Sequence, residues 1–312
     1  MEAVLNPALI LFLSGIIIGI TFKITLPNSI SKYLGYYLLL ALGLKGGLSL
    51  QENGFINEVI SALSLGILFA LLIPAIAYFY LKNILNTEDA AALSGTYGSV
   101  SAVTFVTAIA YLSTTNQDFD NYMSAVLVVM EFPAIFMALY LVTHNKINKG
   151  TNLQTIKTAF LEIPNIILIS SLFVGYFVNK TVISNIDIFI VTIFDYVLYI
   201  FLFVMGTRVA KRTGELKGKG VNLIAFALLT PLIGSLIALI ASINFDLSVG
   251  NSTLLMVLTA SASYIAVPAV VKDAIPDANP AIYLGLSLGV TFPFNIIFGI
   301  PLYNELAKYF IG

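Results

Sequence analysis

Apolar and polar residues alternate along this chain in long blocks, and the apolar blocks have the length of membrane spans. A helix needs about 20 apolar residues to cross the hydrocarbon core of a bilayer, and only short polar joints separate the blocks. The pattern predicts an all-α membrane protein with ten transmembrane helices. The ten apolar runs are residues 7–22, 33–50, 57–81, 90–112, 122–143, 161–178, 187–207, 221–243, 251–271 and 280–303.

The composition agrees with a chain that is largely surrounded by lipid. Hydrophobic residues make up 59% of the 312 residues and charged residues 10%, whereas soluble domains carry about 25% charged residues. No basic residue precedes the first apolar run at Pro7, so this run lacks the positive segment of a signal peptide and is predicted to be a permanent span.

Several kinds of chemistry are excluded. A formal net charge of −1 does not fit a nucleic-acid surface, which needs clustered basic residues. The chain has no cysteine, and its one histidine, His144, lies in a polar stretch that predicts a solvated loop. We find no Walker A motif, zinc-binding histidine pair, Gly-x-Ser-x-Gly elbow or pair of intramembrane carboxylates. We therefore expect a protein that is not an enzyme and needs no cofactor.

The basic residues between the runs predict the orientation. With the N-terminus outside, eleven basic residues fall in inner loops and only Lys180 and Lys308 in outer ones. Basic residues favour cytoplasmic loops, so we expect a multi-pass plasma-membrane protein with both termini outside. The eleven are Lys23, Lys32, Lys82, Lys146, Lys149, Lys157, Lys211, Arg212, Lys217, Lys219 and Lys272.

Local motifs recur in the same order in the two halves of the chain. Pro7 matches Pro164 at an offset of 157 residues, Leu-Leu-Ile-Pro at 71–74 matches Leu-Leu-Thr-Pro at 228–231, and Glu-Phe-Pro at 131–133 matches Thr-Phe-Pro at 291–293. Five helices per half would make the second half enter the membrane in the opposite direction. The pattern predicts two inverted five-helix repeats, residues 1–145 and 146–312, an architecture common among secondary transporters.

Two hydroxyl-rich patches occupy matching runs of the two halves. Residues 95–104 (GTYGSVSAVT) and 259–268 (TASASYIAVP) combine small, hydroxyl and proline residues that weaken a helix. Small residues can also simply allow helices to pack closely. Because interrupted helices at matching positions indicate a transporter's substrate site, we predict that helices 4 and 9 are interrupted and cross near the midplane.

These patches supply the candidate site residues. Helix N-termini attract anions, while hydroxyl and carboxylate oxygens suit a hard cation such as sodium. Lys45 and Arg208 lie within or at the ends of apolar runs and are read as anion guides or structural cations; Asp195 and Asn165 are further polar candidates. For substrate we select Gly98, Ser99, Ser101, Ser263, Tyr264 and Asn295, and for sodium Thr104, Glu131, Ser261 and Thr291.

Three segments resemble the sodium-dependent bicarbonate transporter family of cyanobacteria and other bacteria. They are ALGLKGGL at 41–48, YGSVSAVTF at 97–105 and EFP at 131–133, and the resemblance extends over nearly the whole length. It implies a core and a gate domain built from both repeats, a homotrimer, and inward symport of bicarbonate with sodium as the coupling ion. It also implies a small cytosolic PII-like regulatory partner, although the central link, residues 143–160, is shorter than in cyanobacterial members.

Other functions stay open on the residues alone. A bile-acid-type or auxin-type carrier and a sodium/proton antiporter share interrupted helices in a five-plus-five repeat. A large organic anion would need a wider cavity than these small residues suggest, and an antiporter would favour paired carboxylates near the crossing. A channel or membrane sensor belongs to a different class and would be recognised by single-channel currents or by ligand binding without flux.

Overall fold

The computed structural model describes residues 7–24, 26–145, 161–178, 192–213 and 220–312, and these residues contain helices but no strands. The bounds of the longer helices follow the predicted apolar runs closely. The elements are α1 (Pro7–Phe22), α2 (Asn28–Asn53), α3 (Asn57–Leu81), α4 (Thr87–Gly98), α5 (Ala102–Thr114), α6 (Met123–Asn145), α8 (Ile163–Phe177), α10 (Ile193–Thr213), α11 (Val221–Asn244), α12 (Val249–Ala260), α13 (Ala266–Ala274), α14 (Pro280–Leu286), η4 (Ser287–Thr291), α15 (Phe292–Phe294), η5 (Asn295–Gly299) and α16 (Ile300–Ile311).

Length and composition make the described helices suitable for a membrane. Six helical stretches within the described residues could cross one: 28–53, 57–81, 87–114, 193–212, 221–244 and 280–311. Three shorter apolar helices, α1, α8 and α12, accompany them. Large apolar side chains on α3 and α11, such as Phe79 and Ile240, are more than half exposed, as expected for surfaces that face lipid. The prediction of an all-α membrane protein is confirmed, while the count of ten spans stays a prediction.

Some helix ends differ from the hydrophobic pattern because a helix can continue past its first charged residue. Lys211 and Arg212 lie in the last turn of α10, Lys272 in that of α13 and Lys308 in that of α16. Lys32 lies in α2, so the loop assignment of these five residues was wrong. Cations are stabilised near helix C-termini by the helix dipole. The backbone of His144 is also helical, at the end of α6. Lys146, Lys149, Lys157, Lys180, Lys217 and Lys219 lie outside the described residues.

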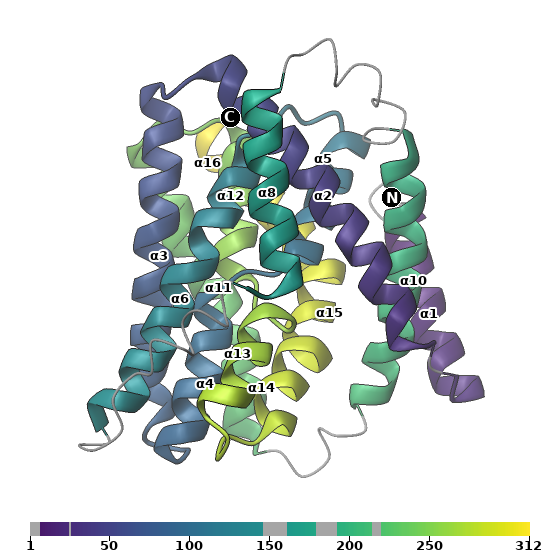
Figure 1. Cartoon of the computed structure of the whole chain (residues 1–312), viewed down its shortest axis with the longest axis vertical. Coiled ribbons are helices and arrows are strands. Elements are labelled where there is room, and N and C mark those ends of the chain that lie inside the picture. The colour runs from purple at the N-terminus through teal and green to yellow at the C-terminus, as the bar shows by residue number, and fades with distance from the viewer. Residues whose placement is uncertain (1–6, 25, 146–160, 179–191, 214–219) are drawn as a thin grey trace.

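Two close helix pairs form one side of the molecule. Helix α1 packs along α10, and α2 packs along α8 and also contacts α10; Figure 1 shows α1 beside α10 at the right edge. Helices α3 to α6 and α11 to α16 pack against one another and form the larger remaining part of the molecule. The structure therefore has a smaller four-helix group and a larger group that contains both hydroxyl-rich patches.

Glycines allow the paired helices to approach closely. A Cβ added to Gly43 would lie 2.7 Å from the Leu168 carbonyl oxygen, and one added to Gly47 would lie 2.6 Å from the Tyr176 nitrogen, both on α8. This Gly-x-x-x-Gly pattern is typical of tightly packed membrane helices. The glycine-rich segment around Lys45 thus serves helix packing.

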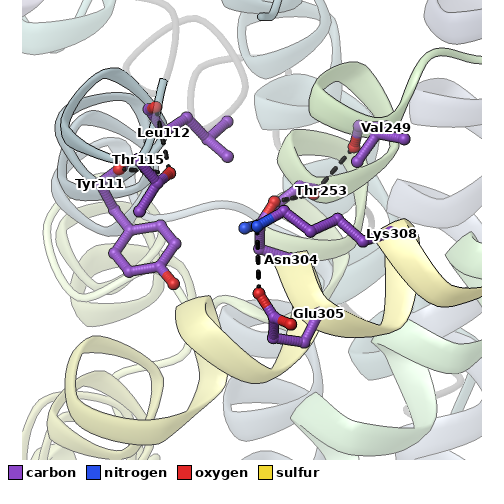
Figure 2. Close-up of polar contacts among 8 residues, drawn as sticks. All are labelled: Tyr111, Leu112, Thr115, Val249, Thr253, Asn304, Glu305 and Lys308. Atoms are coloured by element: carbon purple, nitrogen blue, oxygen red, sulfur yellow. Dashed lines mark hydrogen bonds and ion pairs between the residues drawn. The ribbon is translucent and has the colours of Figure 1, made fainter. Parts of the chain in front are cut away.

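Polar contacts join helices at the end of the bundle where α5 ends and α12 begins, as Figure 2 shows. The Thr253 hydroxyl on α12 donates to the Val249 carbonyl at 2.8 Å and to Oδ1 of the buried Asn304 on α16 at 3.3 Å. The Thr115 hydroxyl donates to the carbonyl of Tyr111 at 3.0 Å. The Tyr111 carbonyl also accepts the Thr115 backbone N–H at 3.0 Å, so the hydroxyl adds a second hydrogen bond at the C-terminal end of α5.

Candidate functional site

The first hydroxyl-rich patch is an interruption between two helices. Helix α4 ends at Gly98 and α5 begins at Ala102, while Ser99 (φ −90°, ψ 172°) and Ser101 (φ −105°, ψ 105°) have extended backbones. The Ser101 hydroxyl accepts hydrogen bonds from the Thr104 backbone N–H at 3.2 Å and from the Thr104 hydroxyl at 2.9 Å. Ser101 is therefore the N-cap of α5, and the predicted interruption is confirmed.

The second patch is interrupted in the same way, with two more residues in the gap. Helix α12 ends at Ala260 and α13 begins at Ala266. Pro268 lies in the first turn of α13, where its missing N–H removes no intrahelical hydrogen bond. The proline thus fixes where the helix restarts, and the break lies on its N-terminal side.

The two breaks bond directly to each other. The backbone N–H of Ser101 donates to the Ser261 hydroxyl at 2.9 Å, and the backbone N–H of Ser263 donates to the Thr96 carbonyl at 2.7 Å. Non-helical backbone at membrane depth must be satisfied within the protein or line a polar cavity. In Figure 1, α4 and α13 lie in the lower half and α5 and α12 in the upper half, so the breaks meet near mid-height.

A cavity of about 40 Å³ lies beside the breaks. A cavity needs roughly 10–15 Å³ on this measure to hold one water molecule, so this one has room for more than a single water. The cavity is partly open and is lined by the two breaks, by α6 and by α2 and α8 of the smaller helix group. Its lining residues are Leu39, Val100, Ser101, Ala102, Val103, Leu127, Glu131, Pro164, Asn165, Leu168, Ser263, Tyr264 and Ile265.

Opposite electrostatic features meet in this cavity. Ala102 and Val103 form the first turn of α5, whose backbone N–H groups have no intrahelical partner and carry the positive end of the helix dipole. Glu131 lines the same cavity and is 7% exposed. The buried Ser99 hydroxyl lies beside the Glu131 carboxyl group without a hydrogen bond to it. The cavity therefore offers donors for an anion and oxygen atoms for a cation.

Several predicted residues belong to this site. Ser101, Glu131, Ser263 and Tyr264 line the cavity. Ser99 neighbours Glu131, while Thr104 and Ser261 bond to Ser101. Both Ser99 Oγ and Tyr264 Oη are buried without a hydrogen-bond partner, and of the two only Tyr264 lines the cavity.

Three other predicted residues support the breaks from outside the cavity lining. A Cβ added to Gly98 would collide with the ring of Pro74 on α3. The Thr291 hydroxyl donates to the Ala227 carbonyl at 2.8 Å and is hydrogen bonded to the Tyr97 hydroxyl. The Asn295 amide donates to the carbonyl of Ala260, the last residue of α12, at 2.8 Å.

Lys45 and Arg208 join α2 to α10 at opposite ends of these helices. Lys45 Nζ on α2 lies 4.4 Å from the ring centroid of Phe194, in the first turn of α10. Arg208 Nη2 on α10 donates to Asn28 Oδ1, in the first residue of α2, at 2.8 Å. Neither cation lines the cavity. These contacts favour the structural role, and anion guidance stays a prediction.

Asp195 lies at the beginning of the candidate span 193–212 rather than in its middle. It lies in the first turn of α10 and is exposed, where a carboxylate complements the helix dipole. Asn165, which follows the N-terminal proline of α8, does line the cavity. The apolar lining residues Leu39 and Leu127 carry no sequence signal, because only the folded arrangement distinguishes them from other apolar residues of α2 and α6.

Interrupted helices that meet beside a small polar cavity are typical of secondary transporters. The family model of the Na+-dependent bicarbonate transporter superfamily matches residues 7–308. The chain therefore belongs to that superfamily, and the resemblance drawn from residues 41–48, 97–105 and 131–133 is confirmed. A search of curated protein sequences found no significant match.

Proposed function

We propose that this protein imports bicarbonate together with sodium across the plasma membrane by alternating access. The observation that carries the proposal is the cavity in which the first turn of α5 and the carboxyl group of Glu131 face the same space. The anion would accept hydrogen bonds from the α5 N-terminus, Ser101 and Ser263. Sodium would be held by oxygen atoms of Glu131, Ser99 and Thr104.

Electrostatics supports coupling between the two ions. Two unit negative charges 4 Å apart repel by about 4 kcal/mol at an effective dielectric constant of about 20. An ionised Glu131 and a bound bicarbonate would be such a pair in a cavity of about 40 Å³. A sodium ion between them converts the repulsion into two attractions, so sodium would bind first and create the anion site.

The membrane potential gives the coupling an energetic reason. Importing one anion against an inside-negative potential costs about 2.3 kcal/mol per 100 mV. One sodium per bicarbonate cancels this cost, and the sodium gradient then drives accumulation.

The proposed architecture is ten spans in two inverted repeats, residues 1–145 and 146–312. Helix contacts support it: α1 packs with α10 and α8 with α2, and α3 packs with α4 as α11 does with α12. The close-approach glycines follow the same relation, since Gly15 on α1 contacts α10 and Gly175 on α8 contacts α2. We propose that α1, α2, α8 and α10 form the gate and the larger group forms the core.

The assembly and the partner are also proposals. The family likeness favours a homotrimer and a cytosolic PII-like regulator. The segment between α6 and α8, residues 146–160, is where such a regulator would be expected to bind, and it lies outside the described residues.

Uptake of labelled bicarbonate by purified protein in liposomes tests the function. An inward sodium gradient should accelerate uptake, and a potassium gradient of the same size should not. Ser101→Ala removes the cap of α5, a change worth about 1 kcal/mol, and Glu131→Gln removes the proposed sodium charge. Both should raise the sodium concentration needed for half-maximal uptake.

The matched control is Ser94→Ala in the same interrupted helix. The Ser94 hydroxyl is equally buried and donates only to the Ala91 carbonyl at 2.9 Å, away from the cavity, so uptake should stay unchanged. Sodium-independent uptake by the unaltered protein would refute the coupling. Normal sodium dependence in both site variants would refute the site assignment.

A second small-ion mechanism uses the same carboxyl group. Protonation of Glu131 would also remove its repulsion of an anion, so a proton could replace sodium as the coupling ion. Uptake driven by a proton gradient in sodium-free buffer, and lost in Glu131→Gln, would favour that alternative.

A further inference from the structure

Two polar contacts outside the cavity lining are alike: in each, a buried polar residue near the start of an interrupted helix bonds to a loop in the other half of the chain. Asp89 and Asn251 each occupy the third position of the half-helix that leads to a break, α4 and α12 respectively. Asp89 is 7% exposed and Asn251 is fully buried. Polar side chains at this depth need hydrogen-bond partners, and both find them in the other half of the chain.

The first contact fastens the beginning of α4. Asp89 Oδ1 accepts the backbone N–H of Asn279 at 2.6 Å. Asn279 caps α14, because its own Oδ1 accepts the Ala281 N–H at 3.0 Å. Asn86 caps α4 and donates to Asp89 Oδ2 at 3.1 Å. The start of α4 is thus bonded to the loop that follows the other interrupted helix.

The second contact fastens the beginning of α12 in the reciprocal manner. Asn251 Oδ1 accepts the backbone N–H of Asp120 at 2.9 Å, and Asn251 Nδ2 donates back to Asp120 Oδ2 at 2.8 Å. Asp120 lies in the loop that follows α5, just before α6. Nδ2 also donates to Glu58 Oε1 on α3 at 2.8 Å.

We infer that Asp89 and Asn251 are equivalent positioning residues that hold the two interrupted helices at their far ends. Each half-helix is fixed at its start by the Asp89 or Asn251 contact and at its break by the Ser101 to Ser261 and Ser263 to Thr96 hydrogen bonds. Four contacts at the two ends and the centre make the crossed pair a single rigid unit. The first turns of α5 and α13 then keep their positions around the cavity without a ligand.

The residue types differ for an electrostatic reason. Asn251 faces two carboxylates, Glu58 and Asp120, and therefore needs an amide that can donate as well as accept. Asp89 faces a backbone N–H and the amide of Asn86, which are both donors, so a carboxylate suits it. Asn251→Asp would place a third carboxylate in the group, whereas Asp89→Asn keeps an acceptor oxygen for Asn279.

Paired substitutions test the inference by hydrogen–deuterium exchange of the purified full chain in detergent. Asp89→Leu and Asn251→Asp should speed amide exchange in the break segments 99–101 and 261–265 by on the order of fivefold, because the ordering contact is lost. Asp89→Asn should rescue normal exchange. Thr253→Val is the control within α12, since its hydroxyl bonds to Val249 and Asn304 rather than to the loop before α6. Unchanged exchange in Asp89→Leu would overturn the inference.

The absence of native cysteine allows a second test. Asp89→Cys with Asn279→Cys, and Asn251→Cys with Asp120→Cys, should cross-link under oxidant, and oxidation should restore the protection that the reduced pairs lose. Failure to cross-link would contradict the contacts, and cross-linking without restored protection would contradict their positioning role.

The role in transport rests on the proposed function: sodium-coupled uptake should fall in Asp89→Leu and recover in Asp89→Asn. If the unaltered protein took up no bicarbonate, the proposed function would fail, whereas exchange alone decides the positioning role.

Discussion

Gly98→Ala changes the packing at the first break by a single methyl group. Gly98 is the last residue of α4, and its missing side chain faces the ring of Pro74 in the middle of α3. An added Cβ would lie 2.6 Å from Pro74 Cδ and 2.8 Å from Pro74 Cβ, and would collide with Cγ as well. Real Cβ atoms do not come this close, so α3 or α4 must move.

The expected magnitude follows from which neighbour can yield. The proline ring is closed onto its own backbone, so it cannot rotate away as a flexible side chain would. Overpacking of a rigid core costs about 1–3 kcal/mol, while replacing glycine by alanine inside a helix gains at most about 1 kcal/mol. Gly98 is at a helix end, where that gain is smaller. We therefore expect a net loss of about 1–2 kcal/mol and a displaced Ser99.

Thermal unfolding in detergent and sodium-dependent uptake measure the two consequences. Gly98→Ala should unfold at lower temperature and take up less bicarbonate. Gly35→Ala is the matched control, because its added Cβ would lie 3.5 Å from Phe201 Cε2, an ordinary contact. Pro74→Ala removes two of the colliding ring atoms. Combined with Gly98→Ala, it should therefore raise the unfolding temperature and the uptake above those of Gly98→Ala alone.

Two results would refute this reasoning. An unchanged unfolding temperature for Gly98→Ala would mean that α3 and α4 separate without cost. A double variant with Pro74→Ala that is no more stable than Gly98→Ala would mean that the proline ring is not the obstacle.

Three further predictions concern the supports of the site and the coupling ion. Asn295→Leu removes the side-chain amide that bonds the Ala260 carbonyl and the Tyr303 hydroxyl. Stability, measured by thermal unfolding, should therefore fall by about 1–3 kcal/mol per unpaired group, whereas Tyr303→Phe should lose less. Gly47→Leu should separate α2 from α8, because even a Cβ would lie 2.6 Å from Tyr176 N; a drop in the unfolding temperature would be expected, and normal unfolding would contradict the close packing. Sodium at 100 times its dissociation constant should stabilise the protein by about 2.7 kcal/mol, and an equal thermal shift with potassium would argue against a selective sodium site.

Much of the local structure follows from the order of residues. The runs 7–22 and 57–81 coincide with α1 and α3, because lipid requires continuous apolar helices of spanning length. The two interruptions are also visible in the sequence, since glycine, serine and proline weaken helices through backbone entropy, competing hydrogen bonds and a missing donor. The alternative of an intact, tightly packed helix is wrong for both patches.

The roles of single residues are only partly predictable. Ser101, Glu131, Ser263 and Tyr264 line the cavity as expected. Asn295 was selected for substrate because it is polar within an apolar run, but its amide holds the end of α12. Burial of a polar group requires a partner, yet the sequence does not distinguish a ligand from a carbonyl on another helix.

By itself, the sequence determined a membrane-embedded helical protein with two interrupted helices and a small set of buried polar residues near them. These are consequences of local chemistry: hydropathy sets where helices run, and small or hydroxyl residues set where they stop. The tertiary structure decided which residues share the cavity, that Thr291 and Asn295 support the breaks, and that Asp89 and Asn251 fasten opposite halves of the chain. Those contacts join residues up to 194 positions apart, and their partners are set by helix packing, which no local pattern encodes.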